Sequence, residues 1–67
     1  MTLNALVKRI DDLREAKGIT REKLAFYSEL PKSNITELLQ GTRDPRYTTL
    51  EKIAKGLDIS LSELLKF

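Results

Sequence analysis

A helical pattern stops at Leu30 and Pro31 and resumes at once, and this interruption constrains the fold more than any other feature of the chain. Pro31 excludes the α conformation for Leu30 on steric grounds and has no backbone amide to donate, so the chain must turn there. Pro31 itself suits the first turn of a new helix. Two helices joined by about three or four residues cannot lie antiparallel; they cross steeply, as in a helix-turn-helix unit. We therefore predict a helix over about 21–28 and another over about 31–40, ended by Gly41.

The rest of the chain has the same helical period. Gly18 suits the left-handed end of a first helix, and Thr20 can accept amide hydrogen bonds from the first turn of the next. Thr48 with Glu51, and Ser60 with Glu63, have the spacing of capping boxes at the starts of two later helices. No stretch alternates between apolar and polar residues as a strand does. The apolar stripes are Leu3, Leu6, Val7, Ile10 and Leu13; Ile35, Leu38 and Leu39; Leu50, Ile53, Ala54 and Leu57; and Leu61, Leu64 and Leu65. Together with the helix predicted over about 21–28, these four stripes predict a compact all-α domain of five helices.

Composition narrows the classes of function. The 67 residues permit one domain, 1–67, and contain neither cysteine nor histidine. The chain therefore lacks the commonest metal ligands and the commonest general base, and no carboxylate pair lies in a recognisable motif, so we expect no enzyme, metal or cofactor. No apolar run approaches the roughly 20 residues that span a bilayer, which predicts a cytoplasmic protein without membrane contact. No small-molecule ligand is evident, and the net charge of +2 permits an anionic partner without requiring one.

The second helix of the unit has one apolar face and one hydrogen-bonding face. The steep crossing lets the polar face enter a groove about 12 Å wide, such as the DNA major groove, while the other face stays in the core. The residues of the polar face are Lys32, Ser33, Asn34, Thr36, Glu37 and Gln40. Their side chains carry the donors and acceptors that hydrogen-bond to base edges.

Several motifs occur in a fixed order between residues 10 and 65. They are LREAKGIT at 13–20, EKLA at 22–25, PKSNI at 31–35, Gly41, RDP at 43–45 and TLEKIAKGLDISLSELL at 49–65. In length, order and spacing this run resembles the lambda-repressor and Cro-like helix-turn-helix family of bacterial and phage transcription regulators. The resemblance implies a lambda-repressor-like fold whose recognition helix lies over about 31–40. It also implies a small Cro-type repressor that binds double-stranded DNA in the cytoplasm. No effector or protease segment follows, which favours a free-standing regulator.

The resemblance also implies which residues contact DNA. Positions for base contacts are Lys32, Ser33, Asn34 and Glu37. Lys32 has the donors for guanine, Asn34 pairs with adenine, and Glu37 accepts from cytosine. Positions for phosphate contacts are Thr20, Arg21, Arg43, Arg46 and Tyr47.

The chain departs from the family pattern at three places. Arg21 stands where glutamine is usual, and Glu29 stands where the turn usually has glycine. A left-handed backbone at Glu29 costs on the order of 1 kcal/mol. Phe26 and Tyr27 occupy a stretch that is commonly polar, and either packing between helices or contact with a partner protein explains them.

Several alternatives stay open. The polar face of the second helix is either a DNA-binding surface or simply solvated. Glu37 either accepts from a base or excludes wrong bases, and Arg43 and Arg46 are either phosphate contacts or solubilising loop residues. The alternative function is a protein-interaction module on the same fold, such as an antitoxin or anti-regulator.

The carboxyl-terminal leucines exceed what one edge of a small helix needs for a core. Because one module makes few DNA contacts, we expect a homodimer on a two-fold operator. We expect part of one apolar patch to form the dimer contacts, and its candidate residues are Leu61, Leu64, Leu65 and Phe67.

Overall fold

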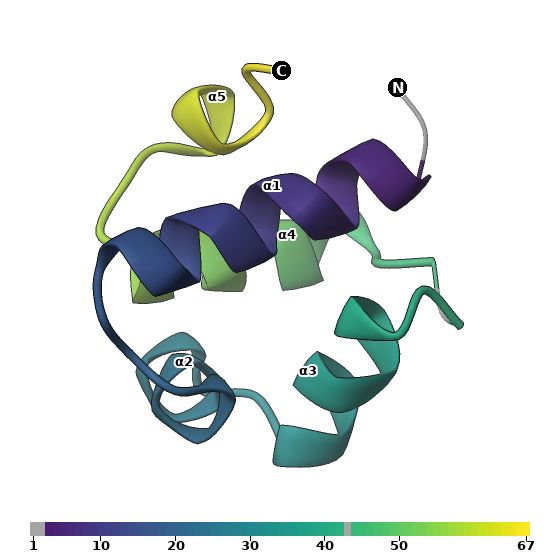
Figure 1. The fold of residues 1–67 in the computed structure, drawn as a ribbon, viewed down its shortest axis with the longest axis vertical. Helices are drawn as coiled ribbons and strands as arrows, with labels where there is room; N and C mark the ends of the chain where they lie inside the picture. The colour runs from purple at the N-terminus through teal and green to yellow at the C-terminus, as the bar shows by residue number, and fades with distance from the viewer. Residues whose placement is uncertain (1–2, 43) are drawn as a thin grey trace.

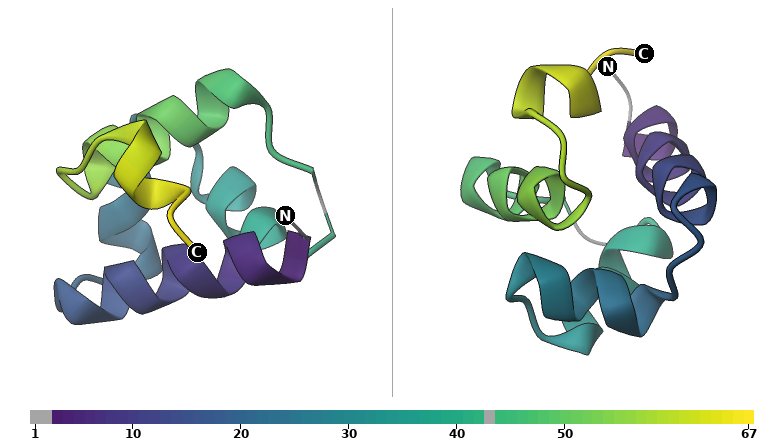
Figure 2. Two further views of the ribbon diagram at one scale, coloured as in Figure 1. Left: turned by 90° about the horizontal axis from the view of Figure 1, so that it is seen from above. Right: turned by 90° about the vertical axis from the view of Figure 1, so that its left-hand side faces the viewer.

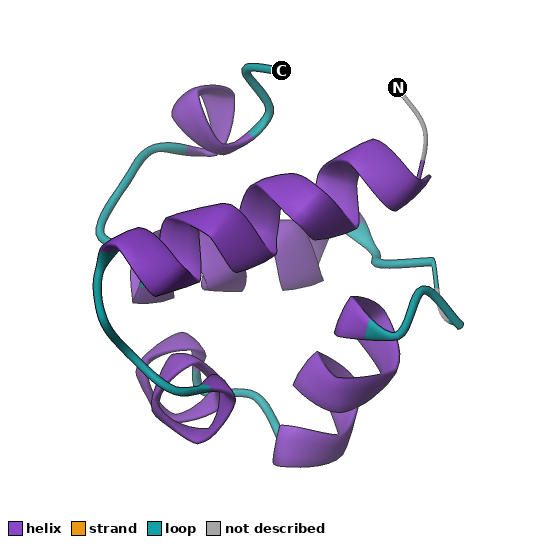
Figure 3. Ribbon diagram, viewed as in Figure 1, coloured by secondary structure: helices purple, strands orange, loops and turns teal. Residues whose placement is uncertain are grey.

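Five helices form where the apolar stripes predict them. The computed structural model describes residues 3–42 and 44–67, and in these ranges every residue lies in a helix or a loop (Figures 1 and 3). The helices are α1 (Leu3–Ala16), α2 (Arg21–Ser28), α3 (Lys32–Leu39), α4 (Tyr47–Gly56) and α5 (Leu61–Leu64). The predicted all-α class with five helices is confirmed.

The helices surround one apolar centre. Helix α2 packs against both α3 and α4, α1 packs against α3, and α5 packs against α4. The α2–α3 unit lies at one end of the molecule and α5 at the other (Figures 1 and 2). Every helix contributes to the core, which consists of Leu6, Ile10, Leu24, Ala25, Ile35, Leu38, Leu50, Ile53, Ala54, Leu57 and Leu64. The helical period therefore identified the buried faces correctly.

Helices α1 to α4 end in the same way. One or two residues after each helix end, a residue adopts a left-handed backbone: Gly18 (φ 69°), Glu29 (φ 56°), Gly41 (φ 74°) and Asp58 (φ 59°). In each case its amide, and the amide that follows, donate back to carbonyls of the last turn, as in a Schellman motif. Glycine was predicted at two of these ends, while acidic residues hold the other two.

A half-buried arginine, Arg14, fixes the turn between α1 and α2. Arg14 Nε donates to Asp11 Oδ1 at 2.9 Å, and its Nη1 donates to the Ile19 carbonyl at 2.7 Å. Thr20 then caps α2, because its Oγ1 accepts from the Lys23 amide at 3.1 Å, as predicted. Arg14 thus holds the start of α2 against the end of α1.

The predicted start of α4 is wrong by two residues, because the N-cap was predicted at Thr48 and lies at Arg46. Helix α4 begins at Tyr47 with Arg46 as its N-cap, and no side chain caps it. Thr48 therefore lies inside the first turn, where it is not the capping residue of a box with Glu51. The reason is that the backbone of Arg46 is already extended (φ −81°, ψ 160°) and the helix starts directly after it.

Helix α5 begins as predicted and is held by α1. Ser60 Oγ accepts from the Glu63 amide at 3.1 Å. Arg9 of α1 donates to the carbonyl of Glu63 at 2.9 Å and to that of Leu64 at 3.4 Å. These bonds occupy carbonyl groups at the end of a helix too short to be stable alone.

Candidate nucleic-acid interface

The turn between α2 and α3 is built around Glu29. Its left-handed backbone lets the Glu29 amide donate to the Phe26 carbonyl at 3.2 Å and the Leu30 amide donate to the Ala25 carbonyl at 3.0 Å. The chain then passes through Pro31, which is extended (φ −60°, ψ 145°) and forms the N-cap of α3. Pro31 thus lies just before the first turn and not in it, which is a small correction to the prediction. The abrupt turn aims α3 away from α2.

Helix α3 divides into a buried face and an outward face. Ile35 and Leu38 are buried in the core. Lys32 and Ser33 at the start of the helix are exposed, while Asn34 and Glu37 are half-buried. Asn34 and Glu37 also interact with other parts of the protein. The four predicted base-contact residues therefore differ in how freely they can meet DNA, and Lys32 and Ser33 project furthest into solvent.

The predicted phosphate-contact residues lie at the starts of two other helices. Thr20 and Arg21 are exposed at the start of α2, and Arg46 and Tyr47 are exposed at the start of α4. The Thr20 hydroxyl oxygen accepts from the α2 amide and still carries a hydrogen to donate. Helix starts carry free amides and partial positive charge, which favour phosphate. Arg43, the remaining predicted contact, lies outside the described residues.

Two contacts bring these helix starts to either side of α3. Lys32 at the start of α3 pairs with Glu22 in the first turn of α2, with 2.9 Å between Nζ and Oε1. Asn34 and Arg46 both line a small pocket between α3 and the loop before α4, together with Leu38, Asp44, Pro45 and Thr49. Potential base contacts on α3 are therefore flanked by potential phosphate contacts from α2 and from α4.

The Glu22–Lys32 ion pair has an electrostatic effect that the sequence did not predict. Hydrogen bonding from Lys32, and then its positive charge, lower the pKa of the Glu22 carboxyl below its ordinary value of 4.5. Glu22 was part of the family motif, but it was assigned no role. The two residues are ten positions apart across the turn, a separation that corresponds to no helical period.

The carboxyl-terminal residues divide into core and surface. Leu64 is 0% exposed and lies in the core, so it is not in the part of the patch that can form dimer contacts. Leu61 and Leu65 are half-buried against the core, and Phe67 is 52% exposed. The side chains available for a dimer in this region are therefore Leu61, Leu65 and Phe67.

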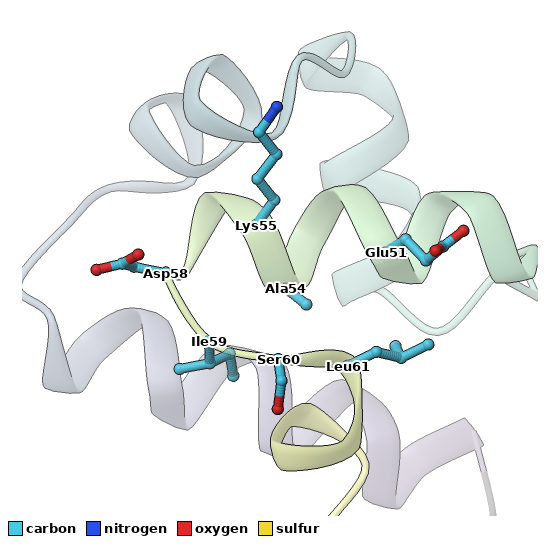
Figure 4. Close-up of a pocket in the computed structure, with 7 residues that line it drawn as sticks. All are labelled: Glu51, Ala54, Lys55, Asp58, Ile59, Ser60 and Leu61. Carbon is cyan, nitrogen blue, oxygen red and sulfur yellow. The ribbon is translucent and has the colours of Figure 1, made fainter.

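An open groove of about 420 Å³ lies between α4 and α5 (Figure 4). Leu61 forms part of its wall, and Lys55 points away from it toward α2. Its other lining residues are Glu51, Ala54, Asp58, Ile59 and Ser60. Within residues 3–42 and 44–67 no cluster of three or more acidic, histidine or cysteine side chains has the arrangement of a metal site.

The aromatic pair of α2 faces solvent. Phe26 is 75% exposed and Tyr27 is 47% exposed, and their ring centroids are 5.8 Å apart. Packing between helices therefore does not explain why an aromatic residue occupies position 26. Among the described residues, no helix is both long and apolar enough to cross a bilayer.

This chain is similar to a known helix-turn-helix family and to known control proteins. The helix-turn-helix family profile matches residues 10–64. The control protein C.BamHI of Bacillus amyloliquefaciens is 33% identical over 61 residues, which cover 90% of this chain and 75% of that protein.

Solved structures of two further controllers are similar over nearly the whole chain. The crystal structure of the restriction-modification controller protein C.AhdI from Aeromonas hydrophila has a TM-score of 0.88 at 36% identity, covering 94% of this chain and 96% of the other. The wild-type restriction-modification controller protein C.Esp1396I has a TM-score of 0.89 at 31% identity, covering 96% and 83%. The fold, the exposed face of α3 and these similarities agree: the chain belongs to the helix-turn-helix family of DNA-binding transcription regulators and is not an enzyme.

Proposed function

We propose that this protein is a sequence-specific regulator of a restriction–modification system that binds a two-fold DNA operator as a homodimer. The observation that carries the proposal is the position of the outward face of α3 between the exposed starts of α2 and α4. A helix placed in this way presents base-contacting side chains to the major groove while two flanking helix starts meet phosphates. The similarity to the controllers C.BamHI, C.AhdI and C.Esp1396I supports the class of regulated genes.

Within this proposal, Lys32, Ser33, Asn34 and Glu37 contact bases, and Lys32 and Ser33 carry most of the base recognition because they are the most exposed. Lys32 donates to O6 and N7 of a guanine. Thr20, Arg21, Arg43, Arg46 and Tyr47 contact phosphates and set the register of the protein on the duplex without distinguishing bases.

Selection of bound duplexes from a random pool, followed by salt titration, tests sequence specificity. We expect one enriched sequence with two-fold symmetry. Its affinity for the protein should exceed that of random DNA by at least about a thousandfold. Equal, salt-steep affinity for all sequences after selection would refute specific regulation.

Two substitutions test the division of roles. Lys32→Ala should relax preference at one or two base pairs at a cost of about 1–3 kcal/mol. Arg46→Ala should weaken operator and random duplexes alike and lower the magnitude of the salt slope by about 0.9. Identical patterns from both variants would contradict the assignment.

A second candidate function, a protein-interaction module such as an antitoxin or anti-regulator, is favoured by the exposed pair Phe26 and Tyr27. Both aromatic residues lie on α2, beside the proposed phosphate contacts. If selection enriches no DNA sequence, replacing both residues by serine and testing for loss of a protein partner is the next experiment.

A further inference from the structure

The ion pair between Glu22 and Lys32 joins the starts of the two helices of the DNA-binding unit. Lys32 Nζ lies 2.9 Å from Glu22 Oε1, and the two side chains are 63% and 71% exposed. The pair therefore forms in the free protein at the surface that faces DNA in the proposed function. Because both partners are exposed, salt screens the pair and another group can displace either partner.

Among the described residues, this pair differs from other exposed ion pairs because one of its members is a proposed base contact. Lys8 and Asp12, for example, lie one turn apart on α1, with 3.2 Å between Nζ and Oδ2, and neither is a proposed DNA contact. Lys32 is the proposed guanine contact, and its ammonium group is held by a residue of the neighbouring helix. Glu22 thus acts on DNA recognition through Lys32.

We infer that Glu22 is a specificity-determining residue, which keeps the ammonium group of Lys32 at the start of α3 and away from the phosphate backbone. The inference rests on the proposed function. An ammonium group has three hydrogens to donate, so Lys32 can keep its bond to Glu22 and still donate to both O6 and N7 of a guanine. It cannot reach a backbone phosphate as easily, because the ion pair must stretch or break and the Glu22 carboxylate repels phosphate.

Glu22 therefore weakens binding to random DNA more than binding to the operator. Random duplexes are bound almost entirely through phosphates, so they gain most when Lys32 is released. The operator already satisfies Lys32 at a base edge. Specificity depends on the ratio of these two affinities, and a repulsive group can raise this ratio without tightening operator binding.

The test compares wild-type protein with Glu22→Gln on two duplexes: the operator obtained by selection and a random duplex of equal length. One additional phosphate contact makes the slope of log affinity against log salt steeper by about 0.9, which corresponds to about eightfold tighter binding at 0.1 M salt than at a 1 M reference. We expect this gain of up to about eightfold on random DNA. The operator should gain less, so the specificity ratio should fall.

Two controls separate this effect from the loss of one negative charge. Asp12→Asn removes the same charge from the exposed pair on α1, and it should change both affinities slightly and equally. In a Lys32→Ala background, Glu22→Gln should no longer change the specificity ratio. Circular dichroism of each variant verifies that it is folded.

The inference is overturned if Glu22→Gln lowers the specificity ratio no more than Asp12→Asn does, or if its effect persists without Lys32. In both cases the wild-type protein would still prefer its operator, so the proposed function would stand. A wild-type protein that binds all duplexes equally would instead refute the proposed function, and this inference with it.

Discussion

Glu29 is a non-glycine residue with a strained, left-handed backbone conformation. Its left-handed conformation completes the end of α2 and starts the turn that directs α3 outward. For a residue with a Cβ this conformation costs about 1–2 kcal/mol. The Glu29 side chain offsets little of this cost, because its ion pair with Lys55 is long (3.6 Å) and exposed. Glu29 thus holds the left-handed conformation that glycine adopts without a Cβ clash.

Glu29→Gly should raise the free energy of unfolding by about 1 kcal/mol, because glycine adopts this backbone without the Cβ clash. Urea denaturation measures the change. Glu29→Ala is the matched control: it removes the same ion pair but keeps the Cβ, and it should leave stability nearly unchanged. Equal stability of the glycine and alanine variants would contradict the strain argument.

The pKa of Glu22 provides a direct measure of its pairing with Lys32. The lowered pKa means that the folded state favours the charged carboxylate. This contribution to stability is present above the unfolded-state pKa, near 4.5, and is lost as pH falls through the lower folded-state pKa. In Lys32→Ala the pKa of Glu22 should rise back toward 4.5, as measured by NMR titration of its side-chain carboxyl. Lys8→Ala should leave the pKa of Glu22 unchanged. If Lys32→Ala also left this pKa unchanged, the pairing would be disproved.

At the scale of elements, Gly56 allows α4 to approach α2 closely, because a side chain at this position would clash with Ser28. A Cβ at Gly56 would overlap Ser28 Oγ and lie 3.0 Å from the Ser28 amide nitrogen. Ser28 is buried, and its hydroxyl has no hydrogen-bond partner among the described residues. The close approach holds the helix-turn-helix unit against the rest of the fold.

Gly56→Ala should therefore destabilise the protein by about 1–3 kcal/mol through overpacking. Ser28→Ala should be neutral or stabilising, because it removes an unpaired buried hydroxyl. The double variant should recover part of the loss, since the clash with the hydroxyl disappears while the contact with the backbone remains. Thermal unfolding followed by circular dichroism tests this order. A Gly56→Ala protein as stable as wild type would show that the two helices can move apart at no cost.

The elements were predictable to the extent that local rules determine them. The helical period identified the buried faces, and the caps at Thr20 and Ser60 marked the starts of α2 and α5. The start of α4 was missed because Arg46 caps it through its backbone alone. The sequence indicated that the carboxyl-terminal patch has more leucines than the core needs, but only tertiary packing decides that the core covers Leu64. The Glu22–Lys32 pair depends on how two helices meet, which no sequence period encodes.

At the scale of the whole molecule, the proposed DNA-binding surface and the proposed dimer contacts lie at opposite ends. The helix-turn-helix unit lies at one end and α5 at the other (Figure 1). A proposed dimer formed through Leu61, Leu65 and Phe67 therefore leaves the outward face of α3 uncovered. Two copies bound to one operator would double the number of phosphate contacts, and the salt slope would steepen accordingly.

Phe67→Ser should weaken the dimer while the monomer stays folded, because this side chain is exposed and outside the core. Leu64→Ala should instead destabilise the monomer by about 2–5 kcal/mol, because it leaves a cavity in the core. Light scattering over a range of concentrations, with and without operator DNA, measures the first effect, and urea denaturation measures the second. If the wild-type protein remains monomeric at high micromolar concentration even on operator DNA, the dimer proposal fails.

The left-handed residues that follow α1 to α4 also have a consequence for chemical synthesis. A D-amino acid has its preferred backbone region where an L-residue is strained, so positions 18, 29, 41 and 58 are sites where the handedness of the chain can be inverted without changing its path. A short chain assembled by peptide synthesis with D-residues at these four turns should keep its fold. Proteases that require L-residues should then cleave the connections between helices more slowly.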